Sequence, residues 1–120
     1  FEQKGENYFR NLEEKITIKS LKNTGDVISL GGGGFINNAI RETILEDHLS
    51  FWLNWDESIL LKRIMGNNQR PKAYNATDEE LIKLIKKRSK IYSKAKFKIN
   101  CNNLTKNEIV KMIIKIYESN

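Results

Sequence analysis

The sequence has little of what secreted, metal-binding and membrane proteins depend on. Its single cysteine, Cys101, cannot form a disulfide within the chain, and we expect it to act as a small buried hydrophobe. No cluster of metal-ligating residues is apparent, and the first residues do not resemble a signal peptide. No apolar run approaches the roughly 20 residues that a bilayer-spanning helix needs. We therefore expect a cytoplasmic protein with no bound structural metal and no membrane contact.

Proline is as scarce as cysteine, because Pro71 is the only one in 120 residues. There is no proline-rich or serine-rich linker, no internal repeat and no low-complexity segment apart from a run of glycines. A composition that is 39% hydrophobic and 30% charged is ordinary for a soluble protein. These features predict a single domain over 1–120 with one core.

The chain is basic, with 21 Lys and Arg against 15 Asp and Glu and a formal charge of +6. The lysines alternate with acids and isoleucines along predicted helices instead of gathering in one block. This pattern favours a solvated basic face over a nucleic-acid-binding stripe, so we expect only weak and nonspecific nucleic-acid binding.

Helical and extended patterns alternate along the chain. Apolar spacing and capping signals predict helices over 6–21, 38–45, 57–65, 78–93 and 106–117, and strands over 27–30, 50–55 and 96–100. Two capping boxes, Thr77 with Glu80 and Thr105 with Glu108, open the last two helices, and Asp56 is placed to cap the third. Strands that alternate with helices pair in parallel through right-handed crossovers, which predicts an α/β fold.

A run of four glycines, 31–34, follows the predicted strand over 27–30. Glycine costs about 0.5–1 kcal/mol against alanine in regular structure, so such a run calls for a reason. A flexible connector is one interpretation. We favour a ligand-contacting loop, because open α/β sheets bind ligands at the carboxyl ends of their strands. The loop is not a Walker loop, since Gly-Lys-Ser and Gly-Lys-Thr do not occur in the chain.

Arg88 continues the apolar face of the helix over 78–93, which is formed by Leu81, Leu84, Ile85, Ile91 and Tyr92. A buried, unpaired guanidinium would cost several kcal/mol. Arg88 therefore either pairs with a carboxylate or phosphate or extends to water along its aliphatic stem. From the residues alone, these two alternatives are equally good.

Two further arginines are candidates for the same site. Arg10 could simply pair with Glu6 or Glu14 on the helix surface, and taken alone this is the better interpretation. Arg70 lies in a long polar stretch, 66–77, which is either solvated or an active-site lid.

Taken in order, these pieces resemble the shikimate kinase family over essentially the whole chain. The resemblance rests on Phe1-x-x-x-Gly5-Glu6-x-x-Phe9-Arg10-x-x-Glu13, Ser29-Leu30-Gly31-Gly32-Gly33, Arg63, Arg70-Pro71 and Arg88-x-x-x-Tyr92. It implies a P-loop NTPase-like fold of the nucleoside-monophosphate-kinase type, with a parallel sheet in a three-layer α/β/α arrangement. It also implies transfer of the γ-phosphoryl group of ATP, with Mg²⁺, to the 3-hydroxyl of shikimate in chorismate and aromatic amino-acid biosynthesis.

The resemblance assigns roles to individual residues. It implies that Arg10 and Arg88 hold the shikimate carboxylate, and that Gly32 and Gly33 touch the substrate. Arginine suits this task because its planar fork can bind a carboxylate through two hydrogen bonds. Arg63 is implied to lie against the adenine, with the turn over 100–106 forming the rest of that pocket. Arg70 is implied to be the catalytic lid arginine, which contacts the nucleotide and offsets phosphate charge.

The chain also departs from the family. Lys72 and Ala73 follow Pro71 where the family usually has two leucines, and Gly34 and Phe35 replace a small residue and a branched one. The family's first strand, its Gly-x-x-Gly-x-Gly-Lys-[Ser/Thr] loop and its aspartate-bearing second strand have no counterpart here. This βαβ unit, on the order of 30 to 50 residues, holds the phosphate cradle and the magnesium ligand. We therefore expect an incomplete kinase domain that is inactive alone and a monomer when complete.

Two other functions remain open from the sequence. One is a different small P-loop kinase that acts on another anionic metabolite. The other is a basic α/β module that binds a partner without catalysis.

Overall fold

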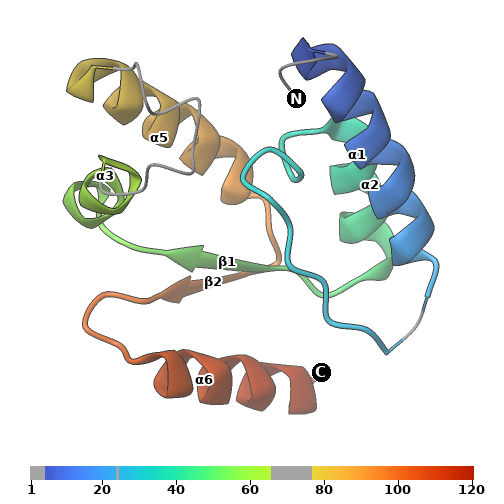
Figure 1. Cartoon of the computed structure of the whole chain (residues 1–120). Helices are drawn as coiled ribbons and strands as arrows, with labels where there is room; N and C mark the ends of the chain where they lie inside the picture. The colour runs from blue at the N-terminus through green and yellow to red at the C-terminus, as the bar shows by residue number, and fades with distance from the viewer. Residues whose placement is uncertain (1–4, 24, 66–76) are drawn as a thin grey trace. The chain divides into compact units, whose positions relative to one another are not determined.

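The computed structural model describes residues 5–23, 25–65 and 77–120, and the chain divides into two compact units, Phe1–Ser50 and Phe51–Asn120 (Figure 1). Along the chain the elements run α1, α2, β1, α3, α5, β2 and α6. None of the described helices has the length and apolar character that crossing a membrane requires.

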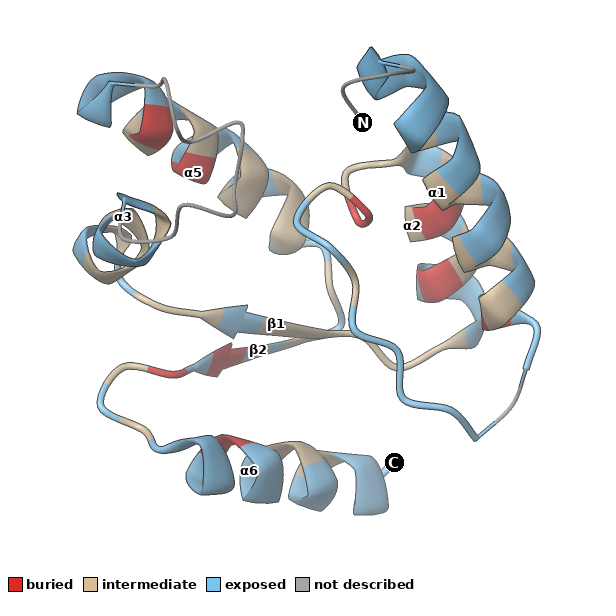
Figure 2. Ribbon diagram, in the orientation of Figure 1, coloured by how far each residue is buried: buried red, intermediate tan, exposed pale blue. Residues whose placement is uncertain are grey.

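The first unit contains two helices in contact, α1 (Gly5–Leu21) and α2 (Asn38–Asp47). Both agree closely with the predicted helices over 6–21 and 38–45. The buried apolar residues of this unit are Leu21, Phe35, Ile40 and Ile44 (Figure 2). Asn37 connects the two helices, because its Oδ1 accepts from the Ile40 N–H at the start of α2 while its Nδ2 donates to Glu14 of α1.

The face that α1 turns inward is not its apolar stripe. Phe9, Leu12 and Ile16 are 38%, 43% and 57% exposed, whereas Arg10 and Glu13, on the neighbouring face, are partly buried. The hydrophobic periodicity of α1 therefore predicts the helix correctly but not the side that packs within this unit.

The prediction of a strand over 27–30 was wrong. These residues form neither helix nor strand, and Val27 is fully exposed. A strand is defined by hydrogen bonds to a neighbouring strand, and in the described part of the chain only β1 and β2 form a sheet. The sequence 27–30 has the composition of a strand, but no described segment pairs with it.

The second unit is built on two parallel strands, β1 (Phe51–Asn54) and β2 (Phe97–Asn100), in the register Phe51 to Phe97 through Asn54 to Asn100. Helices α3 (Glu57–Met65) and α5 (Asp78–Tyr92) cover one face of this sheet, and α6 (Lys106–Glu118) covers the other (Figure 1). This confirms the predicted parallel pairing and gives three layers within the unit.

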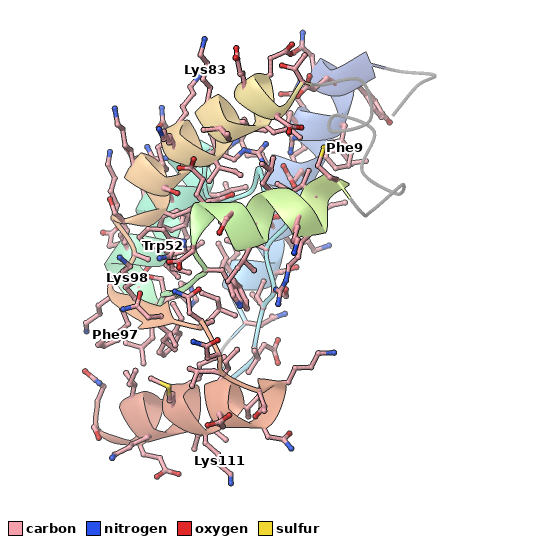
Figure 3. All side chains as sticks on the ribbon, turned by 90° about the vertical axis from the view of Figure 1, so that its left-hand side faces the viewer. Phe9, Trp52, Lys83, Phe97, Lys98 and Lys111 are labelled. Atoms are coloured by element: carbon pink, nitrogen blue, oxygen red, sulfur yellow. The ribbon has the colours of Figure 1, made fainter. Side chains whose placement is uncertain are left out.

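The two faces of the sheet differ in character. Under α6, Ile99, Cys101 and Ile109 form a buried cluster that is joined by Phe51, Trp55, Leu104, Ile113 and Ile116. On the opposite face, the Lys98 Nζ lies 4.9 Å from the centroid of the Trp52 ring (Figure 3), and Trp52 contacts Tyr92 of α5 at 6.3 Å between ring centroids. Alternation along the strands therefore separates an apolar core from an aromatic and cationic face.

Both predicted threonine caps are present. Thr105 accepts from the Glu108 N–H while the Glu108 carboxylate accepts from the Thr105 N–H, so the capping box of α6 is complete. Thr77 accepts from the Glu80 N–H, and its hydroxyl also donates to the Glu80 carboxylate. The pKa of Glu108 is lowered mainly by the hydrogen bond from the backbone N–H of Thr105, and to a smaller extent by the hydrogen bond from its hydroxyl.

Candidate functional site

Arg10 lies in the second turn of α1, where two glutamates of the same helix hold its guanidinium. Its Nη1 donates to Glu13 Oε1 at 2.9 Å, and its Nε lies 3.7 Å from Glu6 Oε1. The guanidinium carbon also lies 5.1 Å from the centroid of the Phe9 ring. The predicted pairing with Glu6 is therefore present. Glu14, the other candidate, accepts a hydrogen bond from Asn37 instead.

The glycine loop packs directly against this arginine. A Cβ atom at Gly33 would lie 2.4 Å from Arg10 Nη1, 2.8 Å from Cζ and 3.0 Å from Nη2. A Cβ at Gly31 would lie 3.6 Å from Glu13 Oε2, which is an ordinary contact. Gly33 is therefore required for close approach to the guanidinium, and the loop brings its backbone to the same side chain that the resemblance places at the substrate carboxylate.

Arg88 is half-buried on α5, one turn after the buried Ile85. It makes no ion pair or side-chain hydrogen bond with any residue in the described ranges. Its position on the inward face agrees with the prediction. Arg10 and Arg88 belong to different units, so their joint action on one carboxylate remains a prediction.

Arg63 stands at the last turn of α3, and its guanidinium carbon lies 4.6 Å from the centroid of the Trp55 ring. Trp55 is the first residue after β1. Nothing in the sequence pattern indicated this contact, which joins the residue after β1 to the last turn of α3.

The segments that follow β1 and β2 are hydrogen-bonded to each other. The Asp56 N–H donates to Asn102 Oδ1, and Asn102 Nδ2 donates to Asp56 Oδ1, both at 2.9 Å. The Asp56 carboxylate was expected to cap α3, but it accepts a hydrogen bond from the Asn102 side chain instead. The next residue, Asn103, has a φ of 63° in the left-handed region, which asparagine adopts more readily than most residues. These contacts shape the turn over 100–106 that the resemblance assigns to the adenine.

A cavity of about 570 Å³ opens between β1, α3 and α5. Trp52, Trp55, Leu60, Ile85 and Ser89 are among the residues that line it. Of the predicted site residues in the described part of the chain, none lines this cavity. Trp52 and Asn54 are two residues apart on β1, so both lie on the face of the strand that lines this cavity.

Comparison with known proteins identifies the family of the chain. The family model described as "Shikimate kinase" matches residues 1–118. The chain belongs to the shikimate kinase family.

Individual relatives agree with this assignment. The chain is 34% identical over 116 residues to a shikimate kinase of Bartonella quintana, covering 96% of this chain and 55% of that protein. It is 33% identical to a shikimate kinase of Thermodesulfovibrio yellowstonii, covering 98% of this chain and 69% of that protein. The chain thus spans about half the length of its Bartonella relative.

A solved structure confirms the predicted fold class. The crystal structure of shikimate kinase from Bacteroides thetaiotaomicron matches with a TM-score of 0.76 and 27% identity, covering 98% of this chain and 70% of that one. The chain therefore has the α/β fold of the P-loop kinases, as expected for a shikimate kinase family member.

Arg70 and most of the predicted lid over 66–77 lie outside the described residues. Within the described residues, no group of three or more His, Cys, Asp or Glu side chains could hold a metal ion.

Proposed function

We propose that this chain contributes the shikimate-binding residues and part of the nucleotide site of a shikimate kinase. The reaction is transfer of the γ-phosphoryl of ATP to the 3-hydroxyl of shikimate, in chorismate biosynthesis in the cytoplasm. Family membership supports the proposal, and the observation that carries it is the packing of Gly33 against the Arg10 guanidinium. This contact joins the two motifs that the family resemblance assigns to one substrate.

In this proposal, Arg10 and Arg88 bind the carboxylate of shikimate. A guanidinium can donate two parallel hydrogen bonds to a carboxylate, which a lysine cannot reproduce. Glu6 and Glu13 limit the rotamers that Arg10 can adopt, so less side-chain entropy is lost on binding. Gly32 and Gly33 let the substrate approach the backbone at the place where Arg10 is held.

The nucleotide would be bound by residues of the second unit and by groups that these 120 residues do not include. We propose that Arg63 lies against the adenine and that Arg70 offsets charge on the phosphates during transfer. The sequence contains no Gly-Lys-Ser or Gly-Lys-Thr, so these residues alone lack the phosphate cradle and should not catalyse transfer. We expect the complete enzyme to be a monomer.

Isothermal titration of shikimate into the full-length protein tests the proposal. Arg88→Leu should weaken shikimate binding by at least about tenfold, because charge-assisted hydrogen bonds contribute about 1.5–3 kcal/mol. Its thermal stability should stay close to that of the wild type, because Arg88 has no partner among the described residues whose charge would be left unpaired. Lys87→Leu, which removes the adjacent exposed charge on α5, is the matched control and should bind normally.

The same titration separates shikimate from other acceptors. Gluconate and a nucleoside monophosphate should compete poorly, since each differs from shikimate in the position of its anionic group. Equal affinity for all three would contradict the assignment of substrate. Failure of shikimate to bind a demonstrably folded protein would refute the proposed function.

A further inference from the structure

Trp55 is held on both sides by hydrogen bonds to the segment that follows β2. The preceding residue, Asn54, accepts from the Cys101 N–H at 2.8 Å, and the following residue, Asp56, forms the two-way pair with Asn102. The indole also packs against the cluster of Ile99, Cys101 and Ile109. The backbone and the ring of Trp55 are therefore both fixed by the sheet.

Arg63, by contrast, is an exposed side chain at the end of α3. It has no ion pair with a carboxylate of the described residues, and its guanidinium carbon lies 4.6 Å from the centroid of the Trp55 ring. Arginine stacks on tryptophan because the negative face of the indole attracts a planar, weakly hydrated cation. This cation–π contact with Trp55 thus restricts where the guanidinium lies.

A guanidinium that lies over an indole has a second face. Because Arg63 is exposed, that face can receive another planar ring, such as a purine base, which would then stack in the order indole, guanidinium, base. The stack stands at the carboxyl edge of two parallel strands, where open α/β sheets bind their ligands. Removing the indole would leave the guanidinium free to occupy many rotamers.

We propose that Trp55 is a positioning residue for the nucleotide, which acts by holding the Arg63 guanidinium as one wall of the base site. The inference rests on the proposed function, because it requires Arg63 to contact the base. It adds that the affinity for a purine nucleotide depends on a residue that need not touch the nucleotide.

The test is the affinity of the full-length protein for ADP, measured by isothermal titration in a double-mutant cycle. Trp55→Leu should weaken ADP binding by about twofold to fivefold, the size of an exposed cation–π contact, and leave shikimate affinity unchanged. Trp55→Phe, which keeps an aromatic face, should recover most of the loss. In an Arg63→Ala background, Trp55→Leu should cause little further loss of ADP affinity, because Trp55 acts on the nucleotide only through Arg63.

A spectroscopic measurement on unsubstituted Trp55 keeps the test valid if the leucine variant does not fold. The indole N–H resonance of Trp55, assigned with Trp55→Phe, should move on ADP addition when Arg63 is present and stay unchanged in Arg63→Ala. Trp52→Phe, at the other tryptophan, is the matched control and should bind ADP normally.

The outcomes separate the inference from the function on which it rests. If Arg63→Ala weakens ADP binding but Trp55→Leu does not, the positioning role is overturned and the proposed function stands. Equal losses for Trp55→Leu with and without Arg63 would mean that Trp55 contacts the base itself, which also overturns the positioning role. If Arg63→Ala leaves ADP binding unchanged, the proposed contact of Arg63 with the adenine is refuted together with the inference. The shikimate-binding part of the proposed function is then still tested by the shikimate titration.

Discussion

The guanidinium of Arg10 lies against the backbone of Gly33, where a Cβ atom would sit 2.4 Å from Nη1. Gly33→Ala should therefore displace the guanidinium and weaken shikimate binding by about tenfold or more, since a misplaced clamp loses its charge-assisted hydrogen bonds. Folding should be little affected, with a loss below about 1 kcal/mol, because the clash is with the far end of a flexible side chain. Isothermal titration and thermal unfolding measure the two effects.

Gly31→Ala is the control within the same loop. Its Cβ would meet Glu13 Oε2 at 3.6 Å, an ordinary contact, so Arg10 should keep its position and shikimate affinity should stay near that of the wild type. If the two alanine variants behaved alike, the close approach to Arg10 would not be the reason for glycine at this position.

Local signals in the sequence predicted most of the secondary structure. The helix predicted over 6–21 is Gly5–Leu21, and Thr77 and Thr105 cap the helices that they were expected to cap. Such features depend on residues within one turn of each other, and a single sequence contains that information. The strand over 27–30 failed because a strand also needs a partner, which its own composition cannot reveal.

The candidate site shows the same limit. The family resemblance named Arg10 and Gly33 separately, but their contact links positions 23 residues apart and became visible only in the structure. On α1, the apolar residues Phe9, Leu12 and Ile16 are exposed, whereas the loop packs on Arg10 and Glu13. The stack of Arg63 on Trp55 had no sequence signal, because neither residue is unusual where it stands.

The pair of Asp56 and Asn102 predicts an unequal effect of two alanine substitutions. Asn102→Ala removes both hydrogen bonds between the segments that follow β1 and β2, while Asp56→Ala removes only the one that its carboxylate accepts. At about 0.5–1.5 kcal/mol for each bond, and toward the lower end because the pair is exposed, Asn102→Ala should lower the free energy of unfolding about twice as much. Urea unfolding of both single variants and the double variant measures this.

The double variant provides the check on this interpretation. If Asn102→Ala already removes both bonds, adding Asp56→Ala should cost little more, so the effects should be clearly non-additive. Asn103→Gly, at the neighbouring residue with a φ of 63°, should be close to neutral because glycine adopts this conformation freely. Fully additive losses would show that the two side chains do not act as a pair.

Cys101 should be unreactive in the folded protein. Its side chain is fully buried and donates to the Ile99 carbonyl. Burial raises the pKa of the thiol, and this effect outweighs the hydrogen bond with the Asn54 backbone and the positive charge of Arg63, which both lower the pKa. A raised pKa lowers the thiolate fraction at a given pH, and the thiolate is the reactive form. A thiol reagent at pH 8 should therefore label this position only after denaturation, with Cys101→Ala giving the baseline. Rapid labelling of the native protein would contradict the buried position.

The capping box of α6 predicts a specific dependence of stability on pH. Hydrogen bonds from Thr105 lower the pKa of Glu108 in the folded protein, below the ordinary glutamate value of about 4.3 that the unfolded chain retains. The ionised carboxylate therefore contributes stability that is fully present above the unfolded value and is lost as the pH falls through the folded one. Glu108→Gln keeps a side chain that can complete a capping box but cannot ionise. The thermal midpoint of this variant should lie below that of the wild type at pH 7, and the difference should shrink toward pH 3.5. A difference that stayed constant with pH would show that the charge of Glu108 does not stabilise the helix.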